Sequence, residues 1–280
     1  MVAIGGGHGL AMVLEAMVDR SDAITGVVSV ADDGGSSGRL RRDLGILAPG
    51  DMRRCLAALT PHGLMRDALE HRFEHGVLSG HPAGNVLLAS LMELEPDPVV
   101  VMDTLTEMVG ARGRVLPATC EPVDLLATAE RGTVKGQVAI SESGAIDDIR
   151  FSPSDPTVPD AVVTAIVEAD LIVLGPGSLY TSVLAPVVPG VAAALGRRQG
   201  VLAYIANLAP EVGETDGYGL DEHVDAVMRH GVEPDVVVAD ANAFSDGRFG
   251  DRLRRYELVG ALESVHDPRR LGAVLSGLVS

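Results

Sequence analysis

Short apolar runs alternate with amphipathic segments along most of the chain. Runs with the continuous apolar character of buried strands lie at residues 2–4, 24–30, 170–174, 201–205 and 236–238. Segments with apolar residues at helical spacing lie at residues 10–18, 52–59, 64–73, 86–94, 159–168, 223–228 and 271–278. Strands that alternate with helices are typical of parallel sheets built from βαβ units. We therefore predict an α/β fold with a doubly wound, mostly parallel sheet.

The alternation changes between residues 112 and 152. Short alternating segments at 115–116, 123–126 and 138–140 replace the strand and helix pattern there, and this spacing is typical of short β-strands. We predict a small β-rich insertion over residues 112–152 within a single α/β domain that spans residues 1–280. The 280 residues are enough to bury a large core.

Composition and charge narrow the classes of partner. The formal net charge of −17 opposes long-range attraction to nucleic acid and to anionic membranes. The apolar runs fall short of the ~20 residues that a membrane span needs, and the first residues enter a strand instead of a basic signal-peptide region. We expect a cytoplasmic protein with no nucleic-acid partner. Cys55 and Cys120 lack Cys-x-x-Cys spacing, so we interpret them as structural thiols instead of zinc ligands or a redox pair.

Three glycine-rich loops follow predicted strands and hold most of the polar chemistry. They are Gly5–Gly9, Asp32–Arg39 and Gly175–Ser182. A helix that starts after such a loop presents free backbone N–H groups and the positive end of its dipole, which favour an anion. Because the carboxyl ends of parallel strands lie at one edge of a sheet, we expect the three loops to line one crevice.

These loops match neither of the two common nucleotide-binding patterns. Leu10 stands where the dinucleotide pattern needs its last glycine, which disfavours a nicotinamide enzyme. The only lysine, Lys135, follows no glycine-rich loop of the kinase type, which excludes a P-loop kinase. Asp32 and Asp33 keep a weak dinucleotide alternative open, because they lie at a strand end roughly 20 residues after the first glycines.

The candidate site residues lie in these loops or in the polar segments that follow later strands. The candidates for binding a nucleotide are Gly6, Gly7, His8, Gly9, Ser36, Ser37, Arg53, Asn85, Gly175, Gly177, Ser178, Tyr180, Asn207 and Tyr218. Catalytic residues stay unassigned, with Asp32, Asp33 and Arg39 as candidates. Asp32 and Asp33 are also candidates for binding Mg²⁺, which prefers oxygen ligands.

Two roles fit the arginines at the start of the helix predicted after Gly50. Positive charge in a first helical turn opposes the helix dipole, so Arg53 and Arg54 indicate either an anionic ligand or ion pairs with Asp51 or Asp43.

Three other residues, His81, Asn85 and Tyr218, also have both a ligand-binding and a structural interpretation. His81 faces a ligand or is a plain loop residue, and Asn85 faces a ligand or caps a helix. Tyr218 stacks on a ligand or packs into the core.

Six ordered motifs resemble the 2-phospho-L-lactate transferase (CofD-like) superfamily, and most closely its gluconeogenesis-factor branch. The motifs are Gly5-Gly-Gly-His-Gly-Leu10, Val30-Ala-Asp-Asp-Gly-Gly-Ser-Ser-Gly-Arg-Leu40, Pro49-Gly-Asp-Met-Arg53 with Cys55, Gly80-His-Pro-Ala-Gly-Asn85, Leu174-Gly-Pro-Gly-Ser-Leu-Tyr-Thr-Ser182 and Gly213-Glu-Thr-Asp-Gly-Tyr218. The resemblance implies a Rossmann-like core, with nucleotide phosphates near Gly6, Gly7, Gly177 and Ser178. It also implies that Asp32 and Asp33 contact a divalent cation or an acceptor substrate.

The branch decides which function the resemblance implies. Gluconeogenesis factors are associated with cell shape and with growth on gluconeogenic carbon sources, and UDP-N-acetylglucosamine is the ligand that we expect. The transferases carry Gly-Pro-Ser-Asn-Pro where this chain has Gly175-Pro-Gly-Ser-Leu179. We therefore expect a nucleotide-sugar-binding regulator that acts through a protein partner in cell-wall or carbon regulation. The alternative is a Mg²⁺-dependent phosphotransferase with a nucleoside diphosphate ligand, and a homo-oligomer stays an open alternative for either.

Overall fold

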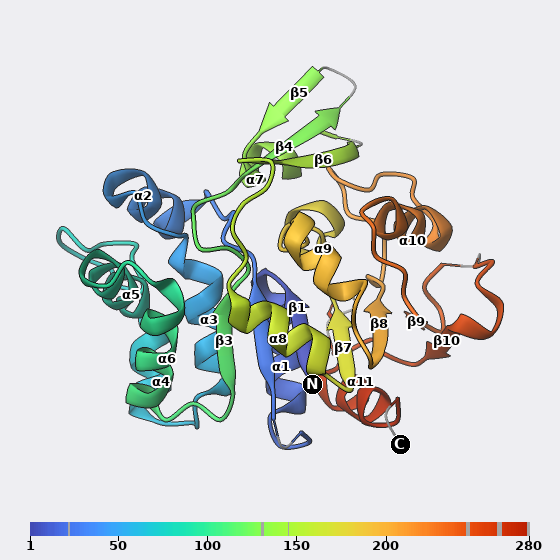
Figure 1. The fold of residues 1–280 in the computed structure, drawn as a ribbon, viewed down its shortest axis with the longest axis horizontal. Coiled ribbons are helices and arrows are strands. Elements are labelled where there is room, and N and C mark those ends of the chain that lie inside the picture. Colours follow the sequence, from blue (N-terminus) through green and yellow to red (C-terminus); the bar gives the residue numbers. More distant parts are fainter. Residues whose placement is uncertain (22, 130–131, 145, 245–246, 262–264, 279–280) are drawn as a thin grey trace.

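The computed structural model describes residues 1–21, 23–129, 132–144, 146–244, 247–261 and 265–278. Its centre is a seven-stranded sheet in the order β10-β9-β8-β7-β1-β2-β3, and each neighbouring pair is parallel (Figure 1). The strands are β1 (Val2–Gly5), β2 (Thr25–Val28), β3 (Arg114–Pro117), β7 (Leu171–Leu174), β8 (Val201–Ile205), β9 (Val236–Asp240) and β10 (Leu253–Tyr256). The predicted doubly wound, mostly parallel α/β fold is confirmed.

Helices cover both faces of this sheet. One face packs against α1 (Gly7–Met17), α3 (Pro49–Leu59), α4 (Leu64–Glu70), α5 (Ala83–Leu94), α6 (Pro98–Val109) and α11 (Pro268–Ser276). The other packs against α8 (Asp160–Glu168), α9 (Pro189–Leu195), α10 (Leu220–Arg229) and the π-helix η1 (Leu179–Val183). Alternate residues of β1 divide between the two faces, since Ile4 joins one hydrophobic cluster and Ala3 the other. Strands covered on both sides must be apolar throughout, as the sequence indicated.

Three further strands form a small antiparallel sheet above the carboxyl edge of the main sheet (Figure 1). They are β4 (Asp124–Ala129), β5 (Gly132–Lys135) and β6 (Ile146–Ser152), and α7 (Gln137–Ser141) packs beneath them. Within the 112–152 segment, β3 belongs to the main sheet, so the small sheet itself takes up residues 124–152. The strand expected at 138–140 is wrong, because Ile140 alone of these residues is buried and a single helical turn places it in the core.

The sequence did not predict the edge strand β10, because its polar Leu253-Arg-Arg-Tyr256 has no buried side chain and lacks an apolar run. The remaining α2 (Gly35–Leu44) and the short 3₁₀ turn η2 (Gly250–Arg252) lie at the ends of loops. In the part of the chain that the structure describes, no helix is long and apolar enough to cross a membrane.

The first and third glycine loops touch at one backbone contact. A Cβ atom placed on Gly9 in α1 would lie 2.0 Å from the carbonyl oxygen of Pro176, in the loop after β7. Neither partner has room to move, since one is a helix turn and the other is backbone. Glycine is therefore required here for the close approach of the loops, and the width of the crevice depends on it.

We expect Gly9→Ala to lower the free energy of unfolding by about 3 kcal/mol, in the upper part of the range for overpacked sites. Chemical denaturation followed by circular dichroism measures this. The matched control is Gly196→Ala at the end of α9, where φ is −66° and the new Cβ lies 3.6 Å from its nearest neighbour. An equal loss of stability in both variants would contradict the close-contact argument.

Candidate functional site

The crevice lies where the strand order of the main sheet reverses. The chain moves outward from β1 to β2 and β3, then returns to β7 on the other side of β1. Such a switch point leaves a gap between the loops at the carboxyl ends of the two central strands, and open α/β sheets bind ligands there. The loops after β2, β1 and β7 are neighbours, as the sequence predicted.

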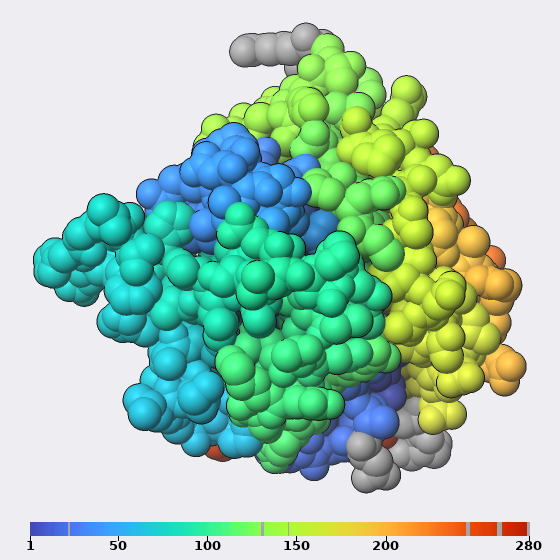
Figure 2. Space-filling model, turned by 60° about the vertical axis from the view of Figure 1, so that its left-hand side comes forward, coloured from blue at the N-terminus to red at the C-terminus, as the bar shows by residue number. Residues whose placement is uncertain are grey.

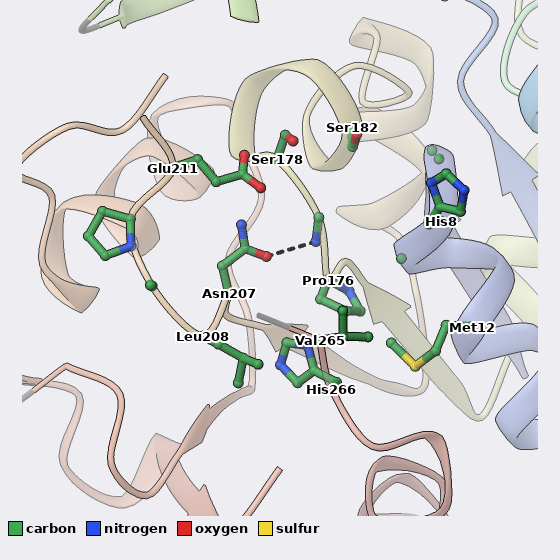
Figure 3. Close-up of a pocket in the computed structure, with 16 residues that line it drawn as sticks. His8, Met12, Pro176, Ser178, Ser182, Asn207, Leu208, Glu211, Val265 and His266 are labelled. Atoms are coloured by element: carbon green, nitrogen blue, oxygen red, sulfur yellow. Dashed lines mark hydrogen bonds between the residues drawn. The ribbon is translucent and has the colours of Figure 1, made fainter. Parts of the chain in front are cut away.

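A pocket of about 420 Å³ opens between the loops of β1, β7 and β8 (Figure 3). Its lining comes from the first glycine loop and α1, the third glycine loop, the segment after β8 and the segment before α11. The residues are Gly6, Gly7, His8, Gly9, Met12, Pro176, Gly177, Ser178, Ser182, Asn207, Leu208, Ala209, Pro210, Glu211, Val265 and His266. The second loop, Asp32–Arg39, lies outside this pocket, so the expectation that three loops line one crevice holds for the first and third loops and is wrong for the second.

The pocket has an apolar side and a set of fixed polar groups. Met12, Leu208 and Val265 lie around His266 on one side (Figure 3). On the other side, Asn207 Oδ1 accepts a hydrogen bond of 3.0 Å from the N–H of Gly177. This bond fixes the Asn207 side chain against the third glycine loop, where it lines the pocket.

His266 is the polar side chain of this pocket that lacks a full set of partners. It is only 6% exposed, and its Nε2 has no hydrogen-bond partner among the described residues. Burial lowers its pKa, although a hydrogen bond with the backbone of Ala206 opposes that shift. A buried polar atom without a partner costs about 1–3 kcal/mol, so a ligand that bonds to Nε2 recovers that free energy.

A buried carboxylate holds the start of the first loop. Asp51 in α3 is 5% exposed; its Oδ2 accepts a 2.8 Å hydrogen bond from the N–H of Gly7, and its Oδ1 pairs with Arg54 at 2.6 Å. Negative charge at the N-terminus of α1 is favoured by the helix dipole. The pKa of neighbouring His8 is lowered, chiefly by the positive charge of Arg54 and then by burial.

Asp32 and Asp33, the acidic pair of the second loop, make different contacts. Asp32 Oδ1 accepts a hydrogen bond of 2.9 Å from Gly34 N–H. The pKa of Asp32 is raised by burial and then by the nearby charge of Asp51, against which the hydrogen bonds from Gly34 and Ser37 act. Asp33 turns away from it, because its Oδ1 accepts a 3.0 Å bond from the N–H of Val138 in α7.

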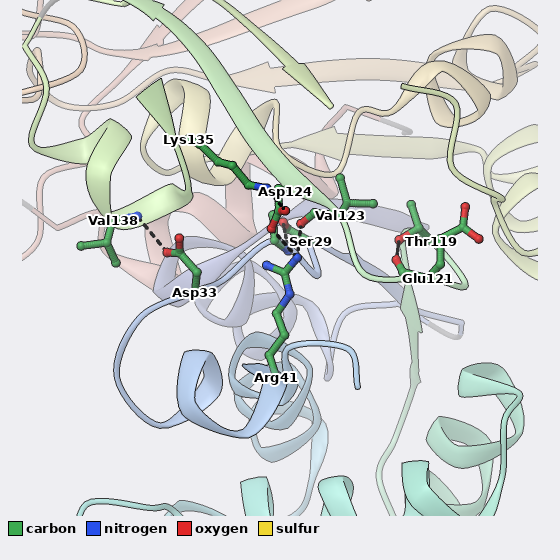
Figure 4. A network of polar contacts seen from close by, with 10 residues as sticks. Ser29, Asp33, Arg41, Thr119, Glu121, Val123, Asp124, Lys135 and Val138 are labelled. Atoms are coloured by element: carbon green, nitrogen blue, oxygen red, sulfur yellow. Dashed lines mark hydrogen bonds and ion pairs between the residues drawn. The ribbon is translucent and has the colours of Figure 1, made fainter. Parts of the chain in front are cut away.

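The Asp33 contact is one of several that join the small sheet to the crevice. Arg41 of α2 pairs with Asp124 of β4 at 2.6 Å, and Lys135 of β5 pairs with the other oxygen of Asp124 at 2.8 Å (Figure 4). Gln137 of α7 donates a bond of 2.7 Å to the carbonyl oxygen of Thr181 in η1. The small sheet therefore fixes the second and third loops relative to each other.

A polar network connects the second loop with α3 and α5. The hydroxyl of Ser36 lies 2.8 Å from His81 Nδ1, and the side-chain amide of Asn85 donates to the same hydroxyl at 3.1 Å. Arg53 Nε reaches Asn85 Oδ1 at 3.4 Å. Asn85 therefore does not cap its own helix. Of the two arginine interpretations, the ion pair holds for Arg54, whereas Arg53 has no ion-pair partner among the described residues.

The third loop is held by Glu214, which the sequence analysis did not single out. Glu214 is 2% exposed. Its Oε2 accepts a 3.1 Å hydrogen bond from Tyr180 N–H, and its carboxylate also bonds with Thr181 at the start of η1. Burial raises the pKa of this carboxyl, and the bonds from Thr181 and Tyr180 oppose the shift.

The structure divides the candidate residues into three groups. The pocket brings together Gly6, Gly7, His8, Gly9, Gly177, Ser178 and Asn207. A second group, outside the pocket, joins Ser36, Ser37, Arg53 and Asn85 beside Asp32, while Arg39 is exposed. The third group, which consists of Gly175, Tyr180 and Tyr218, belongs to neither of these two. Tyr180 is fully buried with its hydroxyl 3.0 Å from that of Tyr218, which donates to Ile146 O, and Gly175 packs against Ile205.

The donor atoms of the second loop suit a hard cation. Asp32 and Asp33 supply carboxylate oxygens, and Mg²⁺ is commonly held by one or two carboxylates together with water and substrate phosphates. Each carboxylate has one oxygen bonded to a backbone N–H, so the second oxygen of each is the one that suits a cation. Among the described residues, no group of three or more metal-ligating side chains converges. Because Asp33 is turned toward α7, either carboxylate would hold the metal only together with phosphate oxygens, and the cation would offset the charge on the phosphate.

Fold and site together define a Rossmann-like α/β protein with a ligand crevice at the topological switch point. The family model described as 2-phospho-L-lactate transferase CofD matches residues 1–273. The chain belongs to the CofD family, and the family indicated by the six motifs is confirmed.

Individual relatives agree with this family. A Mycobacterium tuberculosis protein provisionally named a gluconeogenesis factor is 41% identical over 308 aligned positions, which cover 99% of this chain and 90% of the relative. A gluconeogenesis factor of Halalkalibacterium halodurans is 41% identical over 246 positions, covering 85% of this chain and 76% of the relative. A crystal structure of a UPF0052-family protein from Bacillus halodurans superposes with a TM-score of 0.90 at 34% identity, over 98% of this chain and 97% of that one.

The raised pKa of Asp32 predicts a pH-dependent effect on stability. A carboxyl whose folded-state pKa lies above its ordinary value of 3.8 supports the fold while protonated, and this support is lost as the pH rises through the folded pKa. We expect Asp32→Asn, which keeps an acceptor for Gly34, to raise the melting temperature at pH 7 more than at pH 4. Calorimetric melting at both pH values measures it, with exposed Asp67→Asn as the control; a gain independent of pH would contradict the argument.

Proposed function

We propose that this chain is a regulator in the cytoplasm that binds a nucleotide sugar, with UDP-N-acetylglucosamine as its ligand, and signals through a protein partner in cell-wall or carbon regulation. The observation that carries the proposal is the pocket at the switch point, whose lining includes the buried His266 with its unpartnered Nε2. The names of the relatives support a role in gluconeogenic growth.

The pocket offers a match for each part of such a ligand. The backbone of Gly9 and Gly177 allows close approach of a diphosphate. The apolar side around Met12, Leu208 and Val265 suits a flat ring, with His266 Nε2 as its polar contact. Glu211 lies beside Ser178 at the opening (Figure 3), and a carboxylate there accepts hydrogen bonds from sugar hydroxyls, as acidic residues do for ribose in related folds.

Titration calorimetry with UDP-N-acetylglucosamine tests this proposal. We expect selective binding without Mg²⁺, and no comparable binding of GDP or NAD. His266→Phe keeps a ring of similar size but removes Nε2, and Asn207→Ala frees the N–H of Gly177; each should weaken binding by about tenfold, which corresponds to ~1.4 kcal/mol.

The matched control is Asn242→Ala, an exposed asparagine after β9, which should leave the affinity unchanged. If the wild-type protein shows no heat of binding, or if His266→Phe and Asn207→Ala bind as well as the control does, the pocket is not the nucleotide-sugar site.

A second candidate function is phosphoryl transfer with Mg²⁺. It is favoured by the transferase named in the family description and by the oxygen donors of Asp32 and Asp33 beside the first glycine loop. In this case the acidic pair would bind the metal, which offsets charge on the diphosphate, and Arg39 would contact the transferred group.

Turnover separates the two functions. Under the regulator proposal, we expect no Mg²⁺-dependent release of nucleoside monophosphate from UDP-sugars, measured by chromatography over hours. Release that depends on Mg²⁺ and falls at least about 100-fold in Asp33→Asn would favour the transferase instead. Asp33→Asn is a suitable variant because its carbonyl oxygen still accepts from the N–H of Val138, so the tie to α7 is preserved.

A further inference from the structure

Arg53 is a buried charge that the described protein does not neutralise. The residue is 6% exposed. Its one hydrogen bond with a described residue is the long contact from Nε to Asn85 Oδ1. The two terminal nitrogens of the guanidinium have no acceptor among the described residues, and they are not among the fully buried atoms that lack a partner, so they keep some accessible surface. Buried arginines are almost always paired, because an isolated charge loses its hydration on burial. The fold therefore maintains a costly arrangement at this position.

The charged residues around Arg53 do not compensate its positive charge. Burial is the largest cause that lowers its pKa, followed by the positive charge of Arg54, while Glu70 and Asp51 act in the opposite direction and Arg72 adds to the lowering. Asp51 is already paired with Arg54, and Glu70 is exposed. The nearby carboxylates therefore do not complete an ion pair with Arg53.

Hydrogen bonds connect Arg53 with α2 and His81 through Asn85 and Ser36. Asn85 contacts Arg53 with its oxygen and the hydroxyl of Ser36 with its nitrogen. Ser36 is in the first turn of α2, whose N-cap Gly34 offers no side-chain cap; the first three N–H groups of the helix have no acceptor among the described residues. In Figure 2 the surface of α2 lies directly against that of α5, and the buried contact between Ser36 and Asn85 joins the two helices beneath it.

His81 contacts this network through the hydroxyl of Ser36. Its pKa is lowered by burial first, then by the charges of Arg39 and Arg72, against the effect of Asp43. The ring is thus favoured in its neutral form. Its Nδ1 shares a hydrogen bond of 2.8 Å with the hydroxyl of Ser36, which also accepts from the amide of Asn85.

We propose that Arg53, the first turn of α2 and His81 form a second anion subsite that binds a phosphoryl group and lies outside the nucleotide-sugar pocket. A guanidinium pairs with two phosphate oxygens at once, and the N–H groups of a helix N-terminus suit the third. The subsite lies beside Asp32, on the β2 side of the crevice. It takes a phosphorylated second ligand, and it does not depend on the ligand proposed for the pocket.

Inorganic phosphate is the probe for this subsite. We expect phosphate to raise the melting temperature of the wild-type protein saturably, by roughly 3 °C, beyond the effect of sodium chloride at equal ionic strength. The rise should persist when UDP-N-acetylglucosamine is present. Arg53→Met removes the charge but keeps a flexible apolar side chain, so it should lose the response to phosphate without melting below the wild type in its absence.

Two further variants make the test independent of how well Arg53→Met folds. Ser36→Asp places a carboxylate beside Arg53 and should raise the melting temperature without phosphate and abolish the response to it. Arg66→Met is the matched control, because that arginine is paired with Glu15 at 2.8 Å; it should melt lower than the wild type and keep the full response.

Three results would overturn the subsite. They are a phosphate response that survives in Arg53→Met, a wild-type response equalled by sodium chloride, and a wild-type response that disappears once UDP-N-acetylglucosamine fills the pocket. The last would place the phosphate on the glycine loops of the pocket instead. Absence of UDP-N-acetylglucosamine binding would contradict the proposed function alone, since the comparison of Arg53→Met with Arg66→Met needs no nucleotide.

Discussion

Two buried carboxylates from remote parts of the chain hold the glycine loops in place. Asp51 accepts from the N–H of Gly7, and Glu214 from the N–H groups of Tyr180 and Thr181. Each takes the position at a helix N-terminus that an anionic ligand would otherwise occupy. The loops are therefore fixed without a ligand, and the capacity to bind anions is left to the other N–H groups and to side chains. The pocket depends on this arrangement, and so does the polar network of Ser36, His81, Asn85 and Arg53.

Much of the fold could be predicted from sequence, because strands covered on both faces must be apolar and the helices between them must be amphipathic. The meeting of the first and third loops at one pocket also followed from the geometry of parallel strands. The strand β10 was missed because an edge strand needs no apolar run, and residues 138–140 became a helix because α7 is placed by contacts with Asp33 and Thr181. Local patterns contain no information about such contacts.

The site was harder to predict for the same reason. Asp51 and Glu214 act on residues 44 and 34 positions away in the sequence, and His266 reaches the pocket from the segment before α11. None of the three stands out in its own segment, although Asp51 and Glu214 lie within two of the six motifs. Tyr180 and Tyr218 stand out in the sequence as candidate ligand contacts, but in the structure their hydroxyls bond with each other, and neither residue lines the pocket. An aromatic residue near a glycine loop therefore does not indicate by itself which way its ring points.

The position of β1 in the middle of the sheet has a consequence for synthesis on the ribosome. Val2 pairs with Thr25 on one side and with Ile172 on the other, so β1 is completed by a strand that is synthesised about 170 residues after it. Until then, one edge of β1 is open, and closing so long a loop is slow. Nascent chains of intermediate length thus expose an apolar strand edge, and they are the form of this protein most in need of a chaperone.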